Sequence, residues 1–427
     1  MQTKLTEIDV FIYGQKIGTL IYHQGAIYFE YDAAFKKSSL EISPLKLSLA
    51  RTTGVYTNPD NFYLYGGLAG VFFDSLPDKH GMAFIDAYFS KKGLKQNQIT
   101  LLHKLAFIGD RGMGAIEYRP KEHEDNQSVL DVLDAKDAYE SMKKILNDKE
   151  EISSIESFMN IIDSVSPLGG GRPKMLITYN PQTKTLRFNT KTIPHGYKRA
   201  IIKFDEIYYG KESLNFTKLE YIYMLMAKEC GIVVPPIYLH EENGEHHLII
   251  ERFDRDSNDE KLHIATASAL MHIDISVPQS SSYEKLFALT RALCNNQLEL
   301  EQLFRRMLFN ALAYNFDDHA KNFSYIMDRF GKWRLSPTYD ITYSKGLATE
   351  HITTINAKGL DFTRDDFYVI AQSQSIKKSR VDAMLREILK VLESFQERAK
   401  AIEIDAKTIK ECSQDLQRQR EVLGFFH

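Results

Sequence analysis

Alternating apolar and polar positions at the start of the chain predict a β-meander. Three short runs have the two-residue period of half-buried strands, namely residues 8–13, 17–22 and 26–31. Turn signals that contain glycine separate them at 14–15 and 24–25. From residue 61 to 93 the apolar positions change to helical spacing, and a glycine-rich turn at 110–114 precedes a short strand at 115–118. We therefore expect a β-rich module that also contains helices.

A second group of strands should follow a polar stretch at 121–127, which is the best candidate for a linker, and a helical segment that ends near residue 163. Four further runs have strand character: residues 174–179, 185–188, 200–204 and 247–253. One amphipathic helix is expected at 217–230, because its apolar positions recur at i, i+3, i+4 and i+7 and Gly231 follows as a stop signal.

After residue 254 the pattern is mostly helical. These periods predict an α+β protein in three parts. We expect a β-rich N-terminal module at residues 1–125, a mixed β/α lobe at 126–254 and a helical C-terminal lobe at 255–427. A chain of 427 residues is long enough to give these parts substantial cores.

Composition excludes several classes of protein. Lys and Arg total 54 against 57 Asp and Glu, so the formal charge of -3 fits neither a strongly basic nucleic-acid coat nor an acidic tail. Three widely spaced cysteines indicate a reducing compartment and give no cysteine zinc motif. The start of the chain lacks the apolar core of a signal peptide, and no apolar run reaches membrane-spanning length. We expect a cytoplasmic protein that does not contact the membrane.

The stretch with the most chemical information is residues 315–324. Asp317 and Asn322 have the Asp-x-x-x-x-Asn spacing of the protein-kinase catalytic loop, and Asp340 follows after a short interval. In kinase chemistry the aspartate accepts a proton from the attacking hydroxyl, while an amide oxygen and a second carboxylate bind Mg²⁺. The spacing alone also fits a polar turn after a helix. The later Tyr-Asp pair and the preceding β/α lobe favour the kinase interpretation.

A kinase also needs a phosphate-binding loop and a lysine upstream, and both are present in that order. Lys203 ends an apolar strand, and Glu220 on the expected helix is the candidate partner that orients it. Lys174 begins the first strand of the lobe and could pair with phosphates. Glycine residues precede it and let the backbone approach phosphate groups: Gly169, Gly170 and Gly171. The simpler interpretations are a flexible turn, solvated lysines and an exposed helical glutamate.

Taken in chain order, these stretches resemble the HipA family, the toxin kinases of toxin–antitoxin pairs. The resemblance runs over roughly residues 8–345, and the Asp-x-His-x-Lys-Asn-Phe-Ser block at 317–324 is its most specific part. The other matching stretches are residues 9–20, 72–78, 109–115, 169–174, 250–255 and 336–340.

The resemblance implies a two-lobed, protein-kinase-like HipA fold and a serine/threonine kinase that uses ATP and Mg²⁺. It implies that Asp317 is the catalytic base, that Asn322 and Asp340 are the metal ligands, and that Lys203 binds ATP. It also implies further contacts with the nucleotide by Glu251, Phe253 and His319.

The resemblance further implies regulation and partners. Proteins of the family phosphorylate a serine in their own glycine-rich loop, which switches the kinase off. Here Pro167 occupies the usual serine position, so Ser166 and then Ser164 are the candidate sites. The implied partners are a HipB-like helix-turn-helix antitoxin, DNA only through that antitoxin, and a protein substrate of the translation machinery such as an aminoacyl-tRNA synthetase.

Two other functions stay open at this point. A catalytically weak chain could act mainly in operon repression as the partner of a helix-turn-helix antitoxin, but the complete set of candidate catalytic residues argues for catalysis. A small-molecule kinase of the aminoglycoside type shares the loop spacing. It gives no reason for the long N-terminal β module or the glycine-rich insertion.

Overall fold

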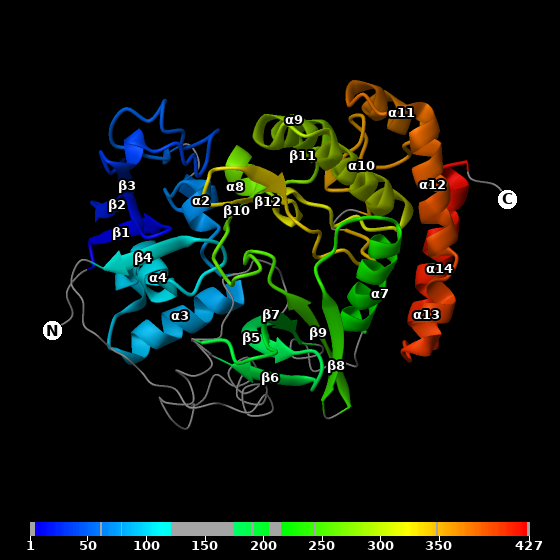
Figure 1. The fold of residues 1–427 in the computed structure, drawn as a ribbon, viewed down its shortest axis with the longest axis horizontal. Coiled ribbons are helices and arrows are strands. Elements are labelled where there is room, and N and C mark those ends of the chain that lie inside the picture. Colours follow the sequence, from blue (N-terminus) through cyan, green and yellow to red (C-terminus); the bar gives the residue numbers. More distant parts are fainter. Residues whose placement is uncertain are drawn as a thin grey trace.

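The computed structural model describes residues 5–59, 62–77, 79–120, 174–188, 192–204, 215–242, 244–346 and 349–424. The N-terminal module lies at one edge of the molecule, the helices α11 to α14 stand at the opposite edge, and a five-stranded sheet lies between and below them (Figure 1). The expected linker at 121–127 and the expected helical segment up to residue 163 lie outside the described residues.

The N-terminal module is built on a four-stranded antiparallel sheet with the order β3-β2-β1-β4. Its strands are β1 (Glu7–Ile12), β2 (Gln15–His23), β3 (Ala26–Tyr31) and β4 (Ile116–Pro120). The predicted meander is therefore confirmed. Tyr13 and Gly14 both have positive φ, as do Gln24 and Gly25, which is the geometry of two-residue hairpin turns. The first turn thus lies one residue earlier than expected.

Short helices cover this sheet. The helical stretch expected from 61 to 93 is divided, because Gly66 and Gly67 both have positive φ and end the first helix. Phe29 of the sheet contacts Phe72 of the second helix at a ring distance of 4.8 Å, so the helices and the sheet share a core. The helical elements of the module are η1 (Phe35–Lys37), α1 (Phe62–Tyr65), α2 (Gly70–Phe73), α3 (Lys79–Lys91), η3 (Gln96–Gln98) and α4 (Leu101–Ile108).

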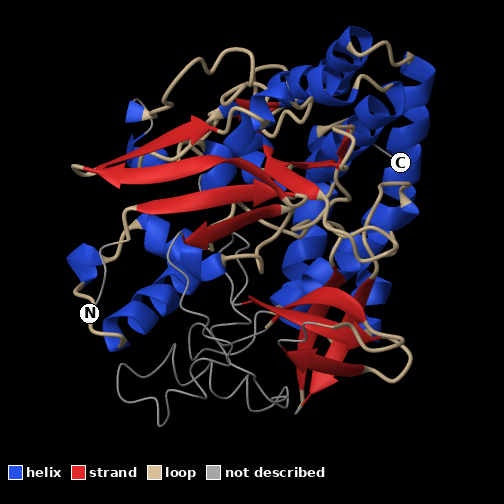
Figure 2. Ribbon diagram, turned by 60° about the vertical axis from the view of Figure 1, so that its left-hand side comes forward, coloured by secondary structure: helices blue, strands red, loops and turns tan. Residues whose placement is uncertain are grey.

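The second part is a five-stranded antiparallel sheet with the order β6-β5-β7-β9-β8, separate from the N-terminal sheet (Figure 2). Its strands are β5 (Lys174–Asn180), β6 (Thr185–Phe188), β7 (Lys198–Lys203), β8 (Ile237–Glu242) and β9 (Glu245–Glu251). The predicted helix is α7 (Phe216–Glu229), which packs on β9 through Met224 and Leu248. Strand β8 was not predicted, because most of its residues are half-buried and have no clear alternation.

The C-terminal lobe is mainly helical, as expected. Its central helix carries an apolar stripe at helical spacing that is fully buried and consists of Phe304, Met307, Leu308, Ala311 and Leu312. Its helical elements are α8 (Ala267–Met271), α9 (Tyr283–Cys294), α10 (Gln297–Leu312), η4 (Ala320–Asn322), α11 (Arg364–Ser373), α12 (Lys378–Leu392), α13 (Phe395–Ala401) and α14 (Ala406–Val422). Among the helices in the described part of the chain, none is long and apolar enough to cross a membrane.

The lobe also holds strands that the helical period did not predict. They form a three-stranded sheet, β10-β12-β13, and a two-stranded parallel pair, β11-β14. Their bounds are β10 (His263–Thr266), β11 (Ser281–Ser282), β12 (Ser324–Met327), β13 (Trp333–Leu335) and β14 (Thr353–Thr354). With two to four residues each, they are too short to show a period in the sequence.

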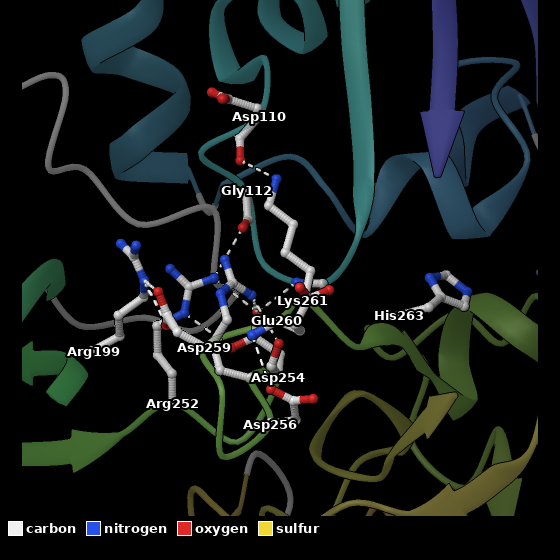
Figure 3. A network of polar contacts seen from close by, with 12 residues as sticks. Asp110, Gly112, Arg199, Arg252, Asp254, Asp256, Asp259, Glu260, Lys261 and His263 are labelled. Carbon is white, nitrogen blue, oxygen red and sulfur yellow. Dashed lines mark hydrogen bonds and ion pairs between the residues drawn. The ribbon is translucent and has the colours of Figure 1, made fainter. Parts of the chain in front are cut away.

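A buried carboxylate joins the N-terminal module to the connection between the two lobes. Asp254 is fully buried and accepts hydrogen bonds from Arg252, from Arg255 and from the backbone N–H of Gly114 at 2.6 Å (Figure 3). Arg252 also donates to the carbonyl of Gly112 at 3.0 Å. Two stretches that lie far apart in the sequence, 109–115 and 250–255, therefore form one polar cluster.

The electrostatics of this cluster favour the charged carboxylate. Burial would raise the pKa of Asp254, but the guanidinium groups of Arg252 and Arg255 outweigh that effect and hold the pKa well below its usual range. Lys261 extends the connection by donating to the Asp110 carbonyl at 2.6 Å and to Glu117 at 2.9 Å (Figure 3). The segment between the lobes is thus fixed from the side of the N-terminal module.

We predict that Asp254→Asn lowers the free energy of unfolding by about 3–5 kcal/mol near neutral pH, because it leaves two buried guanidinium groups without a full counter-charge. Since the folded pKa of Asp254 is below its unfolded value, its contribution to stability is present above about pH 4 and is lost as the pH falls below that value. Denaturant unfolding should therefore show a difference between wild type and variant that shrinks on acidification.

Asp256→Asn is the control, because in the part of the chain that the structure describes the Asp256 carboxylate accepts hydrogen bonds only from backbone amides of its own turn. A variant at Asp254 that is as stable as the Asp256 control near neutral pH would contradict the structural role assigned to this cluster.

Candidate active site

A lysine and a glutamate from different elements form the buried centre of the site. Lys203 is the last residue of β7, and its Nζ lies 2.6 Å from Oε1 of Glu220 on α7. Both residues are almost completely buried, at 6% and 2% exposure. The apolar contact of α7 with β9 holds the helix where Glu220 reaches the strand. The predicted pair is therefore brought together.

Asp340 completes this charge cluster from the C-terminal lobe. Its Oδ1 also accepts a hydrogen bond from Lys203 Nζ. Burial acts against both charges, but their attraction outweighs it. The pKa of Lys203 is raised by Asp340 and Glu220, and the pKa of Asp340 is held well below its usual range by Lys203 and Lys174. Both groups are therefore charged at neutral pH.

Backbone geometry sets the direction of the Asp340 side chain. Its φ of 52° lies in the left-handed region, which aspartate tolerates better than most residues. The segment before it is held by Arg306, a fully buried residue of α10 that donates to the carbonyl of Ser336. Burial lowers the pKa of Arg306 to about 10, so it keeps its charge at neutral pH.

The catalytic-loop candidates lie between α10 and β12. Asn322 lies at the end of η4 and donates from its amide nitrogen to the carbonyl of Asp317 at 2.9 Å, which turns its amide oxygen away from that carbonyl. The Asp317 carboxylate is half exposed, at 49%. His319 lies near both acidic residues, because its Nε2 is 3.9 Å from Asp317 and its ring is the last of the groups that lower the pKa of Asp340.

Tyr339 brings the two metal-ligand candidates into one place. Its hydroxyl donates to the carbonyl of Lys321 at 2.8 Å and bonds Ser324. Since Tyr339 precedes Asp340 and Lys321 precedes Asn322, these contacts place the two segments side by side. On the other side, the ring of Tyr339 stacks on Phe253 with a centroid distance of 5.5 Å. Phe253 is therefore at the site, at the end of the segment that joins the lobes.

Asp318, within the 315–324 stretch, has a structural role that the sequence pattern did not indicate. Its carboxylate is completely buried and accepts hydrogen bonds from the Tyr283 hydroxyl at 3.0 Å and from the Thr353 N–H at 3.0 Å. The Nδ1 atom of His351 lies 2.9 Å away, and the Thr353 hydroxyl donates to the Asp318 carbonyl at 2.5 Å. These partners come from α9 and from the β14 region, so local sequence patterns give no signal for them.

The two adjacent aspartates, Asp317 and Asp318, have different surroundings in this arrangement. Asp318 points into the lobe and anchors the loop, and Asp317 points outward where a hydroxyl group can reach it. A second set of backbone bonds supports the same segment, because the Phe316 N–H donates to the Ser344 carbonyl and the Phe316 carbonyl accepts from Ile352. The loop is thus held on both sides of Asp317.

Other predicted residues have different places. Lys174 is buried directly across the antiparallel ladder from Lys203, so both lysines face the same end of the sheet. Glu251 uses its carboxylate to accept from the Tyr238 hydroxyl at 2.7 Å and its N–H to donate to the Pro236 carbonyl. Its side chain is therefore engaged within the sheet. The expected glycine loop and serines lie outside the described residues: Gly169, Gly170, Gly171, Ser166 and Ser164.

The donor set fits a magnesium–nucleotide complex. Asp340 and Asn322 offer a carboxylate and an amide oxygen, which are hard ligands of the type that Mg²⁺ prefers. Nδ1 of His319 is buried and has no hydrogen-bond partner in the described part of the chain, so a polar atom is available beside the two acidic residues. The charged lysine at the centre of the cluster is suited to phosphate groups. A strand lysine, a helical glutamate and an Asp–Asn loop between two lobes are the features of the protein-kinase-like fold.

Family comparison gives the more specific class. Residues 8–119 match the HipA N-terminal domain and residues 166–396 match the HipA-like C-terminal domain. Because the second match alone spans more than half of the sequence, the chain belongs to the HipA family.

Two curated relatives are similar over part of their length. The serine/threonine-protein kinase toxin HipA of Shewanella oneidensis is 26% identical over 195 residues, which is 41% of this chain and 42% of that protein. A Haemophilus influenzae protein with kinase in its name is 30% identical over 134 residues, covering 28% of this chain and 39% of the relative. The matched stretches therefore span about two fifths of these relatives.

The fold is also that of a solved HipA structure. In the complex of Shewanella oneidensis HipA with HipB and operator DNA, one chain matches with a TM-score of 0.68 and 19% identity. The match covers 98% of this chain and 97% of that one. The likeness therefore extends over the N-terminal module and both lobes.

We predict that Asp318→Asn loosens the catalytic loop. An asparagine places an N–H donor against one of the donors that surround this carboxylate, which should lower the free energy of unfolding by about 1–3 kcal/mol. Amide hydrogen exchange, followed by mass spectrometry, should accelerate in peptides that cover residues 316–322.

Asp366→Asn is the matched control, because Asp366 is also buried and accepts from Asn356 and from the Thr363 N–H, away from this loop. In the Asp366 variant, amide hydrogen exchange at 316–322 should be the same as in the wild type. Equal protection of the loop in all three proteins would show that Asp318 is not its anchor.

Proposed function

We propose that this protein is a cytoplasmic serine/threonine protein kinase and the toxin of a HipA/HipB-like toxin–antitoxin pair. The observation that carries the proposal is the buried charge cluster of Lys203, Glu220 and Asp340 beside the loop with Asp317 and Asn322. Membership of the HipA family and the similarity to the serine/threonine-protein kinase toxin HipA of Shewanella oneidensis support the kinase class.

In the proposed reaction the γ-phosphoryl group of ATP is transferred to a hydroxyl group of a protein. Lys203 is charged and held in place by Glu220, so it can bind phosphate oxygens without a change of protonation. Asp317 is half exposed at the surface of the loop and can orient the attacking hydroxyl and accept its proton. Positioning and charge neutralisation then supply most of the catalysis.

Asn322 and Asp340 would hold Mg²⁺, and the bound metal would neutralise charge on the triphosphate. Phe253 lies beside Tyr339 and offers an aromatic face to the adenine, with Glu251 next to it at the end of β9. Lys174 and His319 would contact phosphates from the two sides of the cluster. Gly169, Gly170 and Gly171 would cover the phosphates, as the sequence suggests.

The proposal also includes autoregulation and binding partners. We expect Ser166, with Ser164 as the second candidate, to accept a phosphate that adds about −1.5 to −2 charge and repels the nucleotide. A HipB-like helix-turn-helix antitoxin is the expected partner, with DNA bound through that antitoxin. The expected substrate is a component of the translation machinery, such as an aminoacyl-tRNA synthetase.

We predict that Asp317→Ala lowers the rate of phosphoryl transfer by about 10²–10⁴, the contribution of a positioned general base. The half-exposed side chain makes little contribution to the core, so the melting temperature should stay close to that of the wild type. Transfer is measured with labelled ATP and a mixture of cellular proteins, and peptide mapping of the kinase itself locates any phosphate on Ser166 or Ser164.

Asp365→Ala, an exposed acidic residue in the first turn of α11, is the control and should retain full activity. Transfer at the wild-type rate by the Asp317 variant would refute the assignment of the base.

We predict that Asp340→Asn weakens the binding of Mg²⁺-ATP by at least about tenfold, because the site loses a negative charge that faces the metal. Titration calorimetry with and without Mg²⁺ measures the effect. Asp328→Asn is the control: in the described residues the Asp328 carboxylate, in the turn between β12 and β13, accepts only from backbone amides of that turn, so this variant should bind as the wild type does. Unchanged affinity of the Asp340 variant would exclude it as a ligand.

A further inference from the structure

The N-terminal module reaches into the catalytic lobe through one carboxylate. Asp74 follows α2, and its Oδ2 accepts from the backbone N–H of Thr266 at 2.7 Å while its Oδ1 accepts from the Thr266 hydroxyl at 3.1 Å. Both donors belong to the C-terminal lobe, 192 positions further along the chain. The carboxylate therefore binds one residue at two points, which fixes the orientation of that residue as well as its position.

Thr266 connects this contact to the catalytic loop. It is the N-cap of α8 and accepts from the Ala269 N–H, so Asp74 also holds the start of that helix. In the ladder of β10 and β12 it lies opposite Ser324, which is two positions after the metal-ligand candidate Asn322. The next residue, Ala267, donates from its N–H to the carbonyl of Phe323 at 2.7 Å.

The same chain of contacts continues to the second metal-ligand candidate. Ser324 bonds the hydroxyl of Tyr339, and Tyr339 precedes Asp340. The electrostatics agree with this proximity, because burial raises the pKa of Asp74 while the ammonium group of Lys321, in the loop itself, acts to lower it. The carboxylate of the N-terminal module is thus within electrostatic range of the loop.

Close packing prevents the module from shifting relative to α8. A Cβ atom on Gly70 would lie 2.5 Å from the carbonyl oxygen of Ala269, so the backbones of α2 and α8 touch directly. Tyr65 donates to the Ser268 carbonyl at 2.9 Å, and the Gly70 N–H donates to His272 at 3.1 Å. Asp74 therefore extends from a rigid surface rather than from a loose attachment.

We propose that Asp74 is a positioning residue for the proposed phosphoryl transfer, through which the N-terminal module holds the Asn322 segment and, through Tyr339, the Asp340 segment in catalytic geometry. The inference rests on the proposed function and adds a role for the module. On this basis the module is a structural part of the active site, in addition to any surface that it offers to partners.

The test uses four variants of the full-length chain. Asp74→Asn and Thr266→Val remove parts of the contact, and Thr266→Ser keeps both of its donors. Asp9→Asn is the matched control, because Asp9 likewise accepts from a threonine hydroxyl, Thr19 at 2.8 Å, and from Lys16, both inside the same module. Each variant is measured for kcat and KM for ATP, for melting temperature, and for amide exchange of peptides over residues 320–327.

We expect Asp74→Asn and Thr266→Val to lower kcat by about 10- to 100-fold, the effect of a small displacement of catalytic groups, with less than about a threefold change in KM. Exchange at 320–327 should accelerate in both. Thr266→Ser and Asp9→Asn should match the wild type in kcat and in exchange at 320–327. Wild-type kcat and exchange in Asp74→Asn, or an equal loss of kcat in Asp9→Asn, would overturn the proposal.

The measurements distinguish a failure of the kinase function from a failure of the positioning role. If the wild-type protein transfers no phosphate, the proposed kinase function is wrong, and the exchange measurement still tests whether Asp74 holds the loop. If the wild type is active and Asp74→Asn matches it in both kcat and exchange, the positioning role is wrong while the kinase function stands. If Asp74→Asn does not fold, Thr266→Val decides the outcome.

Discussion

The ion pair between Lys203 and its two carboxylate partners is the interaction on which the site depends. A buried ammonium group is unfavourable unless opposite charges surround it, and Glu220 and Asp340 come from different parts of the fold. The pair can form only if β7, α7 and the segment before Asp340 are correctly packed together. The apolar contact of α7 on β9 and the Arg306 bond to Ser336 meet this condition from the two lobes.

A second constraint acts on the loop that holds Asp317 and Asn322. One carboxylate must stay exposed while the rest of the loop is fixed. Asp318 is buried among hydrogen-bond donors, so the neighbouring Asp317 can remain half exposed without becoming mobile. Asn322 closes the loop by bonding the Asp317 carbonyl with its nitrogen, which leaves its oxygen available for the proposed Mg²⁺. Asp318 thus fixes the loop, and the adjacent Asp317 stays accessible.

How far the sequence could predict the molecule depends on the range of the interaction. The β-meander, α7 and the buried stripe of α10 follow from local periods, and the pairing of Lys203 with Glu220 follows from the order of motifs in a kinase. The sequence did not predict three features that join residues without a shared local pattern. These are the β10-β12-β13 sheet, the anchor at Asp318 and the bond from Asp74 to Thr266. The turn at Tyr13 and Gly14 was misplaced by one residue, since two tight-turn registers fit the same sequence.

The small size of the elements around the loop gives a physical reason for the long N-terminal module. The strands β10 and β12 have four residues each, and η4 has three, so these pieces cannot hold a fixed geometry by their own hydrogen bonds. They need a rigid neighbour, and the N-terminal module is that neighbour, because α2 packs on α8 on one side and on the four-stranded sheet on the other. Asp254 fixes the same module to the connection between the lobes, and Asp74 fixes it to the strand beside the loop. The module therefore contacts the connection between the lobes through Gly114 and the strand beside the Asn322 loop through Asp74, so one rigid body supports both segments.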